Sequence, residues 1–177
     1  MKINVIVDVQ NDFVTGVLGT EEAKVATQKI IERVKEIRKT DEFLIYTQDT
    51  HQSDYLFTPE GRGLPIPHCL EGTKGWEIVS LADEKMAPHI QKPTFGSLEL
   101  LGAITELNGK GIITEIELFG FCTDICVISN AIILKNAFPL LTISVNADLC
   151  AGTTPEMHEA ALKVMNSCQI NIKYKEA

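Results

Sequence analysis

Cys126 has the surroundings that most favour covalent chemistry in this 177-residue chain. It lies in the segment GFCTDICV (residues 120–127), where an apolar run ends and a helical pattern begins near Thr123 or Asp124. A thiol in the first turn of a helix lies near backbone N–H groups that stabilise anions, lower the thiol pKa and can hold an oxyanion. A buried structural cysteine is the alternative that this segment leaves open.

Asp8 and Lys92 are the candidate partners of this thiol. Asp8 ends the run VIVD, and a carboxylate at the end of a buried strand is poorly solvated, so its pKa can rise towards that of a general base. Lys92 ends the short run HIQK, where it could pair with Asp8 and favour the thiolate of Cys126. Taken alone, each has a simpler interpretation: a turn-capping Asp8 and a solvated Lys92.

Asp49 and His51 form a candidate metal site with His68. They stand at positions i and i+2, so both side chains point to the same side of an extended segment. His68 lies further along, with Glu60 as an additional candidate ligand. Carboxylate and imidazole together suit Zn, Fe or Mn, whereas a hydrogen-bonded loop pair is the alternative. The two remaining histidines, His89 and His158, are interpreted as structural.

Alternating strands and helices must position these residues. Strand-like runs occupy residues 3–7, 43–46, 115–121, 140–145 and 170–174, with a weaker candidate at 89–92, and helical patterns occupy residues 23–37, 124–136 and 154–168. Such alternation predicts a parallel, doubly wound α/β sheet with helices on both faces, in which ligands bind beyond the carboxyl ends of the strands. The candidate residues all end or follow strands, and Asp148 is expected to follow the fifth. The stretch from Asp49 to about Met86 is long and rich in Gly and Pro, so we expect it to build part of the site.

Composition narrows the function classes. The length suits a single domain spanning residues 1–177, and no apolar run approaches the ~20 residues of a membrane helix. A net charge of −8 argues against nucleic acid as a partner. Five cysteines without an export signal or a C-x-x-C unit argue against disulfides and zinc ribbons. We therefore expect a cytoplasmic protein that does not bind membranes.

Several motifs together resemble the isochorismatase-like cysteine hydrolases, particularly the nicotinamidase branch. They are DVQNDF at 8–13, TQDTH at 47–51, PHCLEGTKG at 67–75, KPTFGS at 92–97, GFCTDICV at 120–127 and DLCA at 148–151. These motifs span nearly the whole chain in the family's order. Two positions depart from nicotinamidases: Pro65 stands where a tryptophan usually packs the pyridine ring, and Asp54 and Tyr55 stand where a further histidine ligand is common.

The resemblance implies a six-stranded, mostly parallel sheet of Rossmann-like type and assembly into a homo-oligomer, a dimer or tetramer. It implies Asp8 as base, Lys92 as its charged partner and Cys126 as nucleophile. It also implies a cis peptide before Cys122, with the backbone amides of Cys122 and Cys126 forming the oxyanion hole.

The expected reaction is hydrolysis of the C–N bond of a small amide through a thioester. A divalent metal is a candidate cofactor, no organic cofactor is expected, and Phe13 and Phe95 are candidate substrate-binding residues. The same fold could instead act on a ureido or carbamoyl bond or on a vinyl ether, although vinyl-ether cleavage would not need Cys126. A non-catalytic small-molecule-binding or redox thiol protein is the remaining alternative.

Overall fold

Six parallel strands form one sheet in the order β3-β2-β1-β4-β5-β6. The structure is a computed structural model that describes residues 1–81, 87–109, 111 and 113–174. The strands are β1 (Lys2–Val7), β2 (Phe43–Asp49), β3 (His89–Lys92), β4 (Glu115–Phe121), β5 (Thr142–Ala151) and β6 (Asn171–Lys173). The chain leaves β1 for β2 and β3 on one side, then crosses to β4, β5 and β6 on the other. The predicted doubly wound, six-stranded parallel fold is therefore confirmed.

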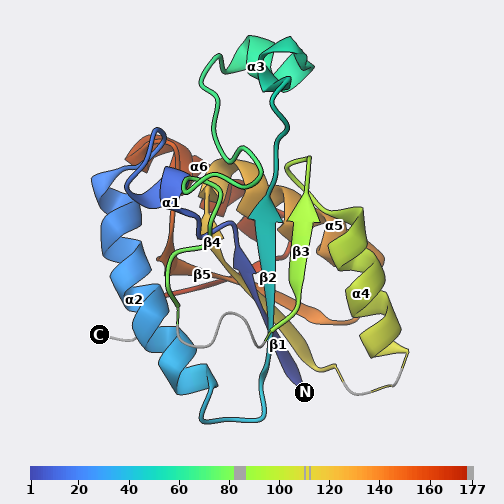
Figure 1. Ribbon diagram of the computed structural model, residues 1–177. Coiled ribbons are helices and arrows are strands. Elements are labelled where there is room, and N and C mark those ends of the chain that lie inside the picture. Colours follow the sequence, from blue (N-terminus) through green and yellow to red (C-terminus); the bar gives the residue numbers. More distant parts are fainter. Residues whose placement is uncertain (82–86, 110, 112, 175–177) are drawn as a thin grey trace.

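Helices cover both faces of the sheet (Figure 1). Helix α2 (Glu21–Ile37) lies against one face, whereas α4 (Leu98–Asn108) and α5 (Ile128–Ala137) lie against the other, with α6 (Pro155–Ser167) packed beside α5. Thr20 caps α2 by accepting a hydrogen bond from the Ala23 amide, and Thr154 caps α6 in the same way, followed by Pro155. Apolar side chains of the central strands, including the fully buried Ile6, fill the space between these layers.

The fifth strand is longer than the sequence pattern predicts. We expected it at residues 140–145, with Asp148 just beyond its end, but β5 continues to Ala151. Its pairing with β4 shifts register between Leu118 and Gly120, and this irregularity lets the strand extend. Asp148 therefore lies within β5 and faces Lys29 of α2 at 3.9 Å, so its expected place beside the other candidate residues is wrong.

Two helices also differ from expectation. The pattern over residues 124–136 becomes a π-helical turn, η3 (Thr123–Val127), followed by α5. In α6, Met157 and Val164 are about half exposed, because the helix buries a narrower face around Ala161, Leu162 and Met165. Helix α1 (Asn11–Val14) and α4 were not expected at all.

The long segment between β2 and β3 forms an ordered protrusion (Figure 1). It contains the 3₁₀ turn η1 (Tyr55–Phe57) and the short helix α3 (Pro59–Gly63), which stands above the carboxyl ends of the strands. The chain then returns to the body, where a parallel bridge joins His51 to Leu70. The structure describes this segment through residue 81, while residues 82–86 lie outside the described residues. Across the described part of the chain, every helix is too short or too polar to span a bilayer.

Candidate active site and metal centre

Asp8, Lys92 and Cys126 meet beyond the carboxyl ends of the strands. Lys92 Nζ lies 2.6 Å from Asp8 Oδ2 and 3.3 Å from Cys126 Sγ. All three are buried, with exposed fractions of 0%, 1% and 4% for Asp8, Lys92 and Cys126. The parallel alignment of β1, β2 and β3 brings the ends of these strands to one edge, and η3 places Cys126 above them. The predicted convergence of the three residues is confirmed as geometry.

The backbone of Asp8 turns its carboxylate towards the second strand. Asp8 has φ +50°, in the left-handed region that Asp adopts more readily than most residues. Thr47 Oγ1 donates a 2.7 Å hydrogen bond to Asp8 Oδ1, so one carboxylate oxygen is held by Thr47 and the other by Lys92. Gly120 lies beside this strand end, where a Cβ would approach Val7 O to 2.0 Å, so only glycine allows the close approach.

The charges of the cluster shift all three pKa values. Burial raises the pKa of Asp8, and the positive charge of Lys92 offsets only part of this rise. Burial alone would lower the pKa of Lys92, but Asp8, Cys126 and Asp49 together raise it well above its ordinary value, so the ammonium persists. Burial and the Asp8 charge raise the pKa of Cys126, in spite of Lys92. This direction is opposite to the expectation that the helix start and Lys92 would lower the pKa of Cys126.

Asp49, His51 and His68 form the cluster expected for a metal. One ligand-type atom from each lies within 4.8 Å of the others, and all three side chains are buried. His51 Nε2 is 3.0 Å from Asp49 Oδ2, and His68 Nε2 is 3.6 Å from the same oxygen. Glu60 Oε1 approaches the two imidazoles at 3.6 and 4.0 Å, from helix α3.

The donor atoms of this cluster fit a divalent ion. His68 Nδ1 donates to the Ile66 carbonyl at 2.8 Å, which leaves the Nε2 lone pair directed at the cluster. Among the described residues, His51 Nε2 is buried without a hydrogen bond of acceptable geometry, even though Asp49 Oδ2 is close. Two converging imidazole nitrogens and two carboxylates are a donor set suited to Zn²⁺, Fe²⁺ or Mn²⁺.

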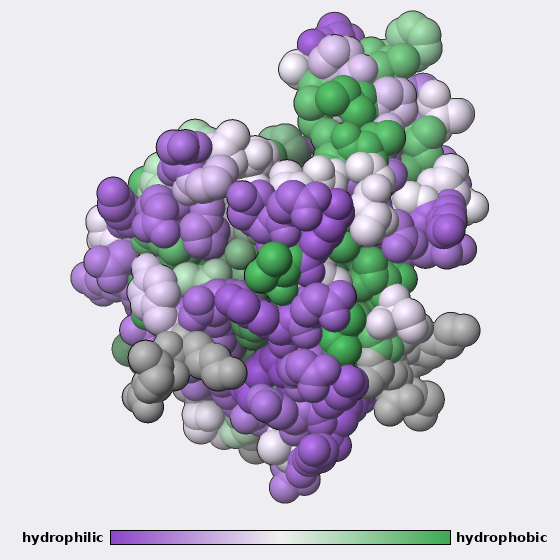
Figure 2. All heavy atoms as spheres, turned by 90° about the vertical axis from the view of Figure 1, so that its left-hand side faces the viewer, coloured by the Kyte–Doolittle hydropathy of each residue, from purple (hydrophilic) through white to green (hydrophobic). Residues whose placement is uncertain are grey.

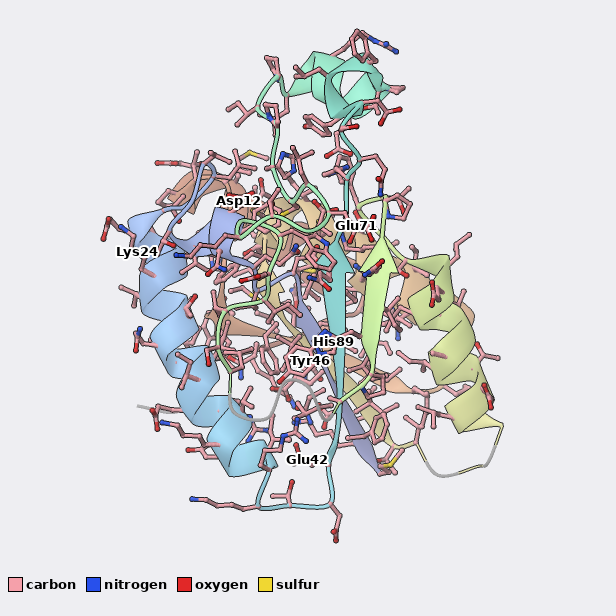
Figure 3. The ribbon with its side chains drawn as sticks, viewed as in Figure 1. Asp12, Lys24, Glu42, Tyr46, Glu71 and His89 are labelled. Atoms are coloured by element: carbon pink, nitrogen blue, oxygen red, sulfur yellow. The ribbon has the colours of Figure 1, made fainter. Side chains whose placement is uncertain are left out.

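Two further polar side chains, Gln10 and Asp12, fix the catalytic cluster and the candidate metal cluster in place. Neither was identified as a site residue from the sequence. Gln10 donates to Asp49 O and accepts from Asp49 N, each at 2.8 Å, so its amide aligns the end of β2. Asp12 Oδ2 accepts from the Cys69 amide at 2.8 Å and thereby holds the chain beside His68. Figure 3 shows Asp12 at this upper end of the sheet, beside the returning segment. The signal was present in the motif DVQNDF, whose polar residues follow a buried strand.

Helix α6 holds the turn that carries Cys126. Thr123 Oγ1 lies 2.8 Å from His158 Nδ1, and Asp124 accepts hydrogen bonds from the amide and hydroxyl of Thr153. The structural interpretation of His158 agrees with this contact. His89, the other histidine interpreted as structural, stacks beside Tyr46 at a ring distance of 5.1 Å, away from the cluster (Figure 3).

A cavity of about 430 Å³ opens above Cys126. Phe13 and Phe95, the two candidate substrate-binding residues, both line it, as do Asp49, Glu60 and His68. The peptide bond between Phe121 and Cys122 is cis, as the resemblance implied. Within η3 the Cys122 carbonyl accepts from the amides of Ile125 and Val127, so the chain folds tightly around the thiol.

The fold and the site define a doubly wound α/β protein with a buried acid–lysine–cysteine cluster beside a candidate metal centre. The model of the isochorismatase domain matches residues 2–173, and the chain belongs to the isochorismatase family.

Individual relatives are distant in sequence but similar over their full length. The nicotinamidase of Schizosaccharomyces pombe is 26% identical over 203 residues, covering 95% of this chain and 90% of the relative. A pyrazinamidase of Pyrococcus horikoshii, solved in complex with zinc, superposes with a TM-score of 0.82 at 27% identity, covering 98% of each chain. A nicotinamidase/pyrazinamidase, PncA, from Bacillus subtilis superposes with a TM-score of 0.80 at 27% identity, covering 97% of this chain and 99% of the relative.

Proposed function

We propose that this protein hydrolyses a small carboxamide to a carboxylic acid and ammonia, with Cys126 as the nucleophile. The observation that carries the proposal is the position of Lys92, whose ammonium contacts Asp8 at 2.6 Å and Cys126 at 3.3 Å in a buried site. A lysine this deeply buried is costly unless it has a function or a matched partner. The amidase relatives support the same reaction class.

Asp8 acts as the general base in the first half of the reaction. It takes the proton of the Cys126 thiol as the sulfur attacks the amide carbonyl, which the raised thiol pKa makes necessary. Backbone amides of Cys122 and Cys126 are the proposed donors to the oxyanion, each contributing about 3 kcal/mol. The C–N bond then breaks, protonated Asp8 returns its proton to the nitrogen, and ammonia leaves behind a thioester on Cys126.

Water completes the cycle. Asp8 takes a proton from water as the oxygen attacks the thioester carbonyl, the C–S bond breaks, and the sulfur regains the proton. Lys92 keeps its charge throughout and holds the Asp8 carboxylate in place. A divalent ion on Asp49, His51 and His68, with Glu60 as a further ligand, would supply Lewis acidity beside the thiol.

The test is ammonia release from a panel of primary amides by the wild-type protein and by Cys126→Ala. Turnover of at least one amide that disappears in the variant supports the proposal. Turnover that persists in Cys126→Ala contradicts the role of Cys126, and a panel without any turnover contradicts the reaction class. Mass spectrometry of the protein, quenched during turnover, checks the thioester as an acyl adduct on Cys126.

The predictions of a homo-oligomer and of a cytoplasmic location stay predictions. The protrusion supports assembly, because Leu56 and Phe57 are 47% and 82% exposed there. Figure 2 shows such hydrophobic side chains gathered on the protrusion at the top of the molecule. Light scattering on the purified protein measures the assembly directly, and Phe57→Asp is expected to weaken it.

A further inference from the structure

The apolar residues that line the cavity above Cys126 range from fully buried to exposed. The buried residues include Cys126, Phe121 and Phe13, which are 4%, 1% and 6% exposed. The less buried residues, here called the rim, are Leu18 and Leu64, which are half-buried, together with the more exposed Phe95. Because this apolar lining continues from the thiol to the surface, a substrate can gain binding energy along the whole depth.

The charged side chains that line the cavity are all acidic. They are Asp49 and Glu60, and the described lining contains no lysine or arginine. Lys92, the nearest cation, is 1% exposed and already pairs with Asp8. Among the described lining residues, a substrate carboxylate would therefore meet two carboxylates and no lysine or arginine with which to pair.

The size of the cavity also bears on the kind of substrate that it can hold. A volume of about 430 Å³ lies in the range of pockets that enclose drug-sized ligands. Small residues leave this space open at the sides, among them Ala23, Ala151 and Gly63. A Cβ added at Gly63 would meet no atom within 4 Å, so a larger side chain is tolerated sterically at this lining position.

We propose that the site takes uncharged carboxamides whose apolar acyl group extends past a single ring to the rim formed by Leu18, Leu64 and Phe95. This inference rests on the proposed amidase function and names its substrate class. The amide carbon lies at Cys126 and the acyl chain runs outwards along the apolar wall. Carbamoyl and ureido acids, which carry a carboxylate, are excluded as preferred substrates.

The experiment compares three amides with the wild-type protein: 4-phenylbutanamide, nicotinamide and N-carbamoylglycine. We expect kcat/KM for 4-phenylbutanamide to exceed that for nicotinamide at least tenfold, with N-carbamoylglycine slowest. Gly63→Phe adds a large side chain at a lining position and, if it fills the cavity, is expected to lower the ratio of the first two values by tenfold or more. Gly102→Phe is the matched control, because Gly102 is also a helical glycine with open space around it, but it lies on α4 outside the cavity.

The outcomes separate the substrate class from the reaction. A higher kcat/KM for nicotinamide or for N-carbamoylglycine overturns the inference but leaves the amidase function standing. The same holds if Gly63→Phe and Gly102→Phe change the ratio of kcat/KM for 4-phenylbutanamide to that for nicotinamide equally. If none of the amides is hydrolysed, calorimetry with Cys126→Ala and 4-phenylbutanamide decides. Binding that Gly63→Phe abolishes supports the pocket assignment although the reaction fails, and absence of binding overturns it.

Discussion

Replacing Lys92 with methionine is expected to destabilise the protein by about 3–5 kcal/mol, because it removes one partner of a buried ion pair. Methionine keeps most of the side-chain volume but not the charge. The carboxylates of Asp8 and Asp49, now 2.6 and 3.4 Å from Lys92 Nζ, would lose their shared cation while remaining 0% and 4% exposed. That cost is a large share of the ~5–15 kcal/mol that stabilises a typical domain.

A double-mutant cycle measures the interaction itself. Asp8→Asn alone leaves the Lys92 ammonium with only Asp49 opposite, so it is also expected to cost about 3–5 kcal/mol. The double variant Asp8→Asn/Lys92→Met removes both charges, and its cost is expected to fall below the sum of the two by about 2 kcal/mol or more. Urea unfolding at pH 7 gives all three free energies of unfolding.

A surface pair of equal length provides the control. Lys24 and Glu21 also lie 2.6 Å apart, but their side chains are 47% and 82% exposed. Lys24→Met is expected to change the free energy of unfolding by less than about 1 kcal/mol, because water screens the exposed pair. If Lys92→Met costs no more than Lys24→Met, or if the cycle is additive within about 0.5 kcal/mol, burial does not set the strength of this pair and the reasoning is wrong.

Three further predictions concern the thiol, the metal and the acid stability. Cys126→Ala is expected to lower amide turnover by about 10⁴-fold or more. Cys168→Ala, which removes an exposed thiol, is expected to leave turnover unchanged. Loss of turnover in both variants would contradict the assignment of Cys126 as the nucleophile. Protein purified without chelator is expected to hold about one divalent ion per chain by elemental analysis. The variant His68→Ala is expected to lose this ion, whereas His89→Ala retains it. Equal metal content in the two variants would contradict the assignment of the ion to this site. The pKa of Glu117 is below its ordinary 4.5, because hydrogen bonds from two lysines outweigh its burial, so its stabilisation is present above about pH 4.5 and lost as the pH falls towards the lowered value. Glu117→Gln is therefore expected to flatten the loss of stability as the pH falls below about 4.5 in urea titrations, and an unchanged pH dependence would refute the linkage.

The sequence was most informative about the fold and the candidate site where the hydrophobic pattern of each segment combines with the order of the segments along the chain. Short apolar runs separated by helical patterns predicted a parallel sheet, and the residues that follow such strands identified Asp8, Asp49 and Lys92. The bounds of β3 and β4 were predicted as the structure has them. A parallel sheet brings its carboxyl ends to one edge, so the position of a residue relative to a strand end already indicates whether it can join the site.

The local sequence pattern gave wrong predictions where contacts between residues far apart in the chain set the strand length or the pKa. Asp148 was expected beyond a strand, but the register shift between β4 and β5 carries the strand past it and turns it towards Lys29. The helix start was expected to lower the pKa of Cys126, but burial and the neighbouring Asp8 raise it. Gln10 was overlooked, because its contacts with Asp49 bridge 39 residues of sequence.

The sequence by itself indicated the succession of strands and helices along the chain and the candidate reactive residues, because hydrophobic periodicity and side-chain chemistry are local properties. Only the tertiary structure decided the direction in which the pKa values of those groups shift and which residues line the cavity. Both depend on which side chains exclude water, and exclusion of water by Phe13, Phe121 and the returning segment at His68 is set by packing between residues far apart in the chain. The same 3.3 Å contact between Lys92 and Cys126 would have little effect in water, whereas in this buried site it joins an acid, a cation and a thiol into one unit.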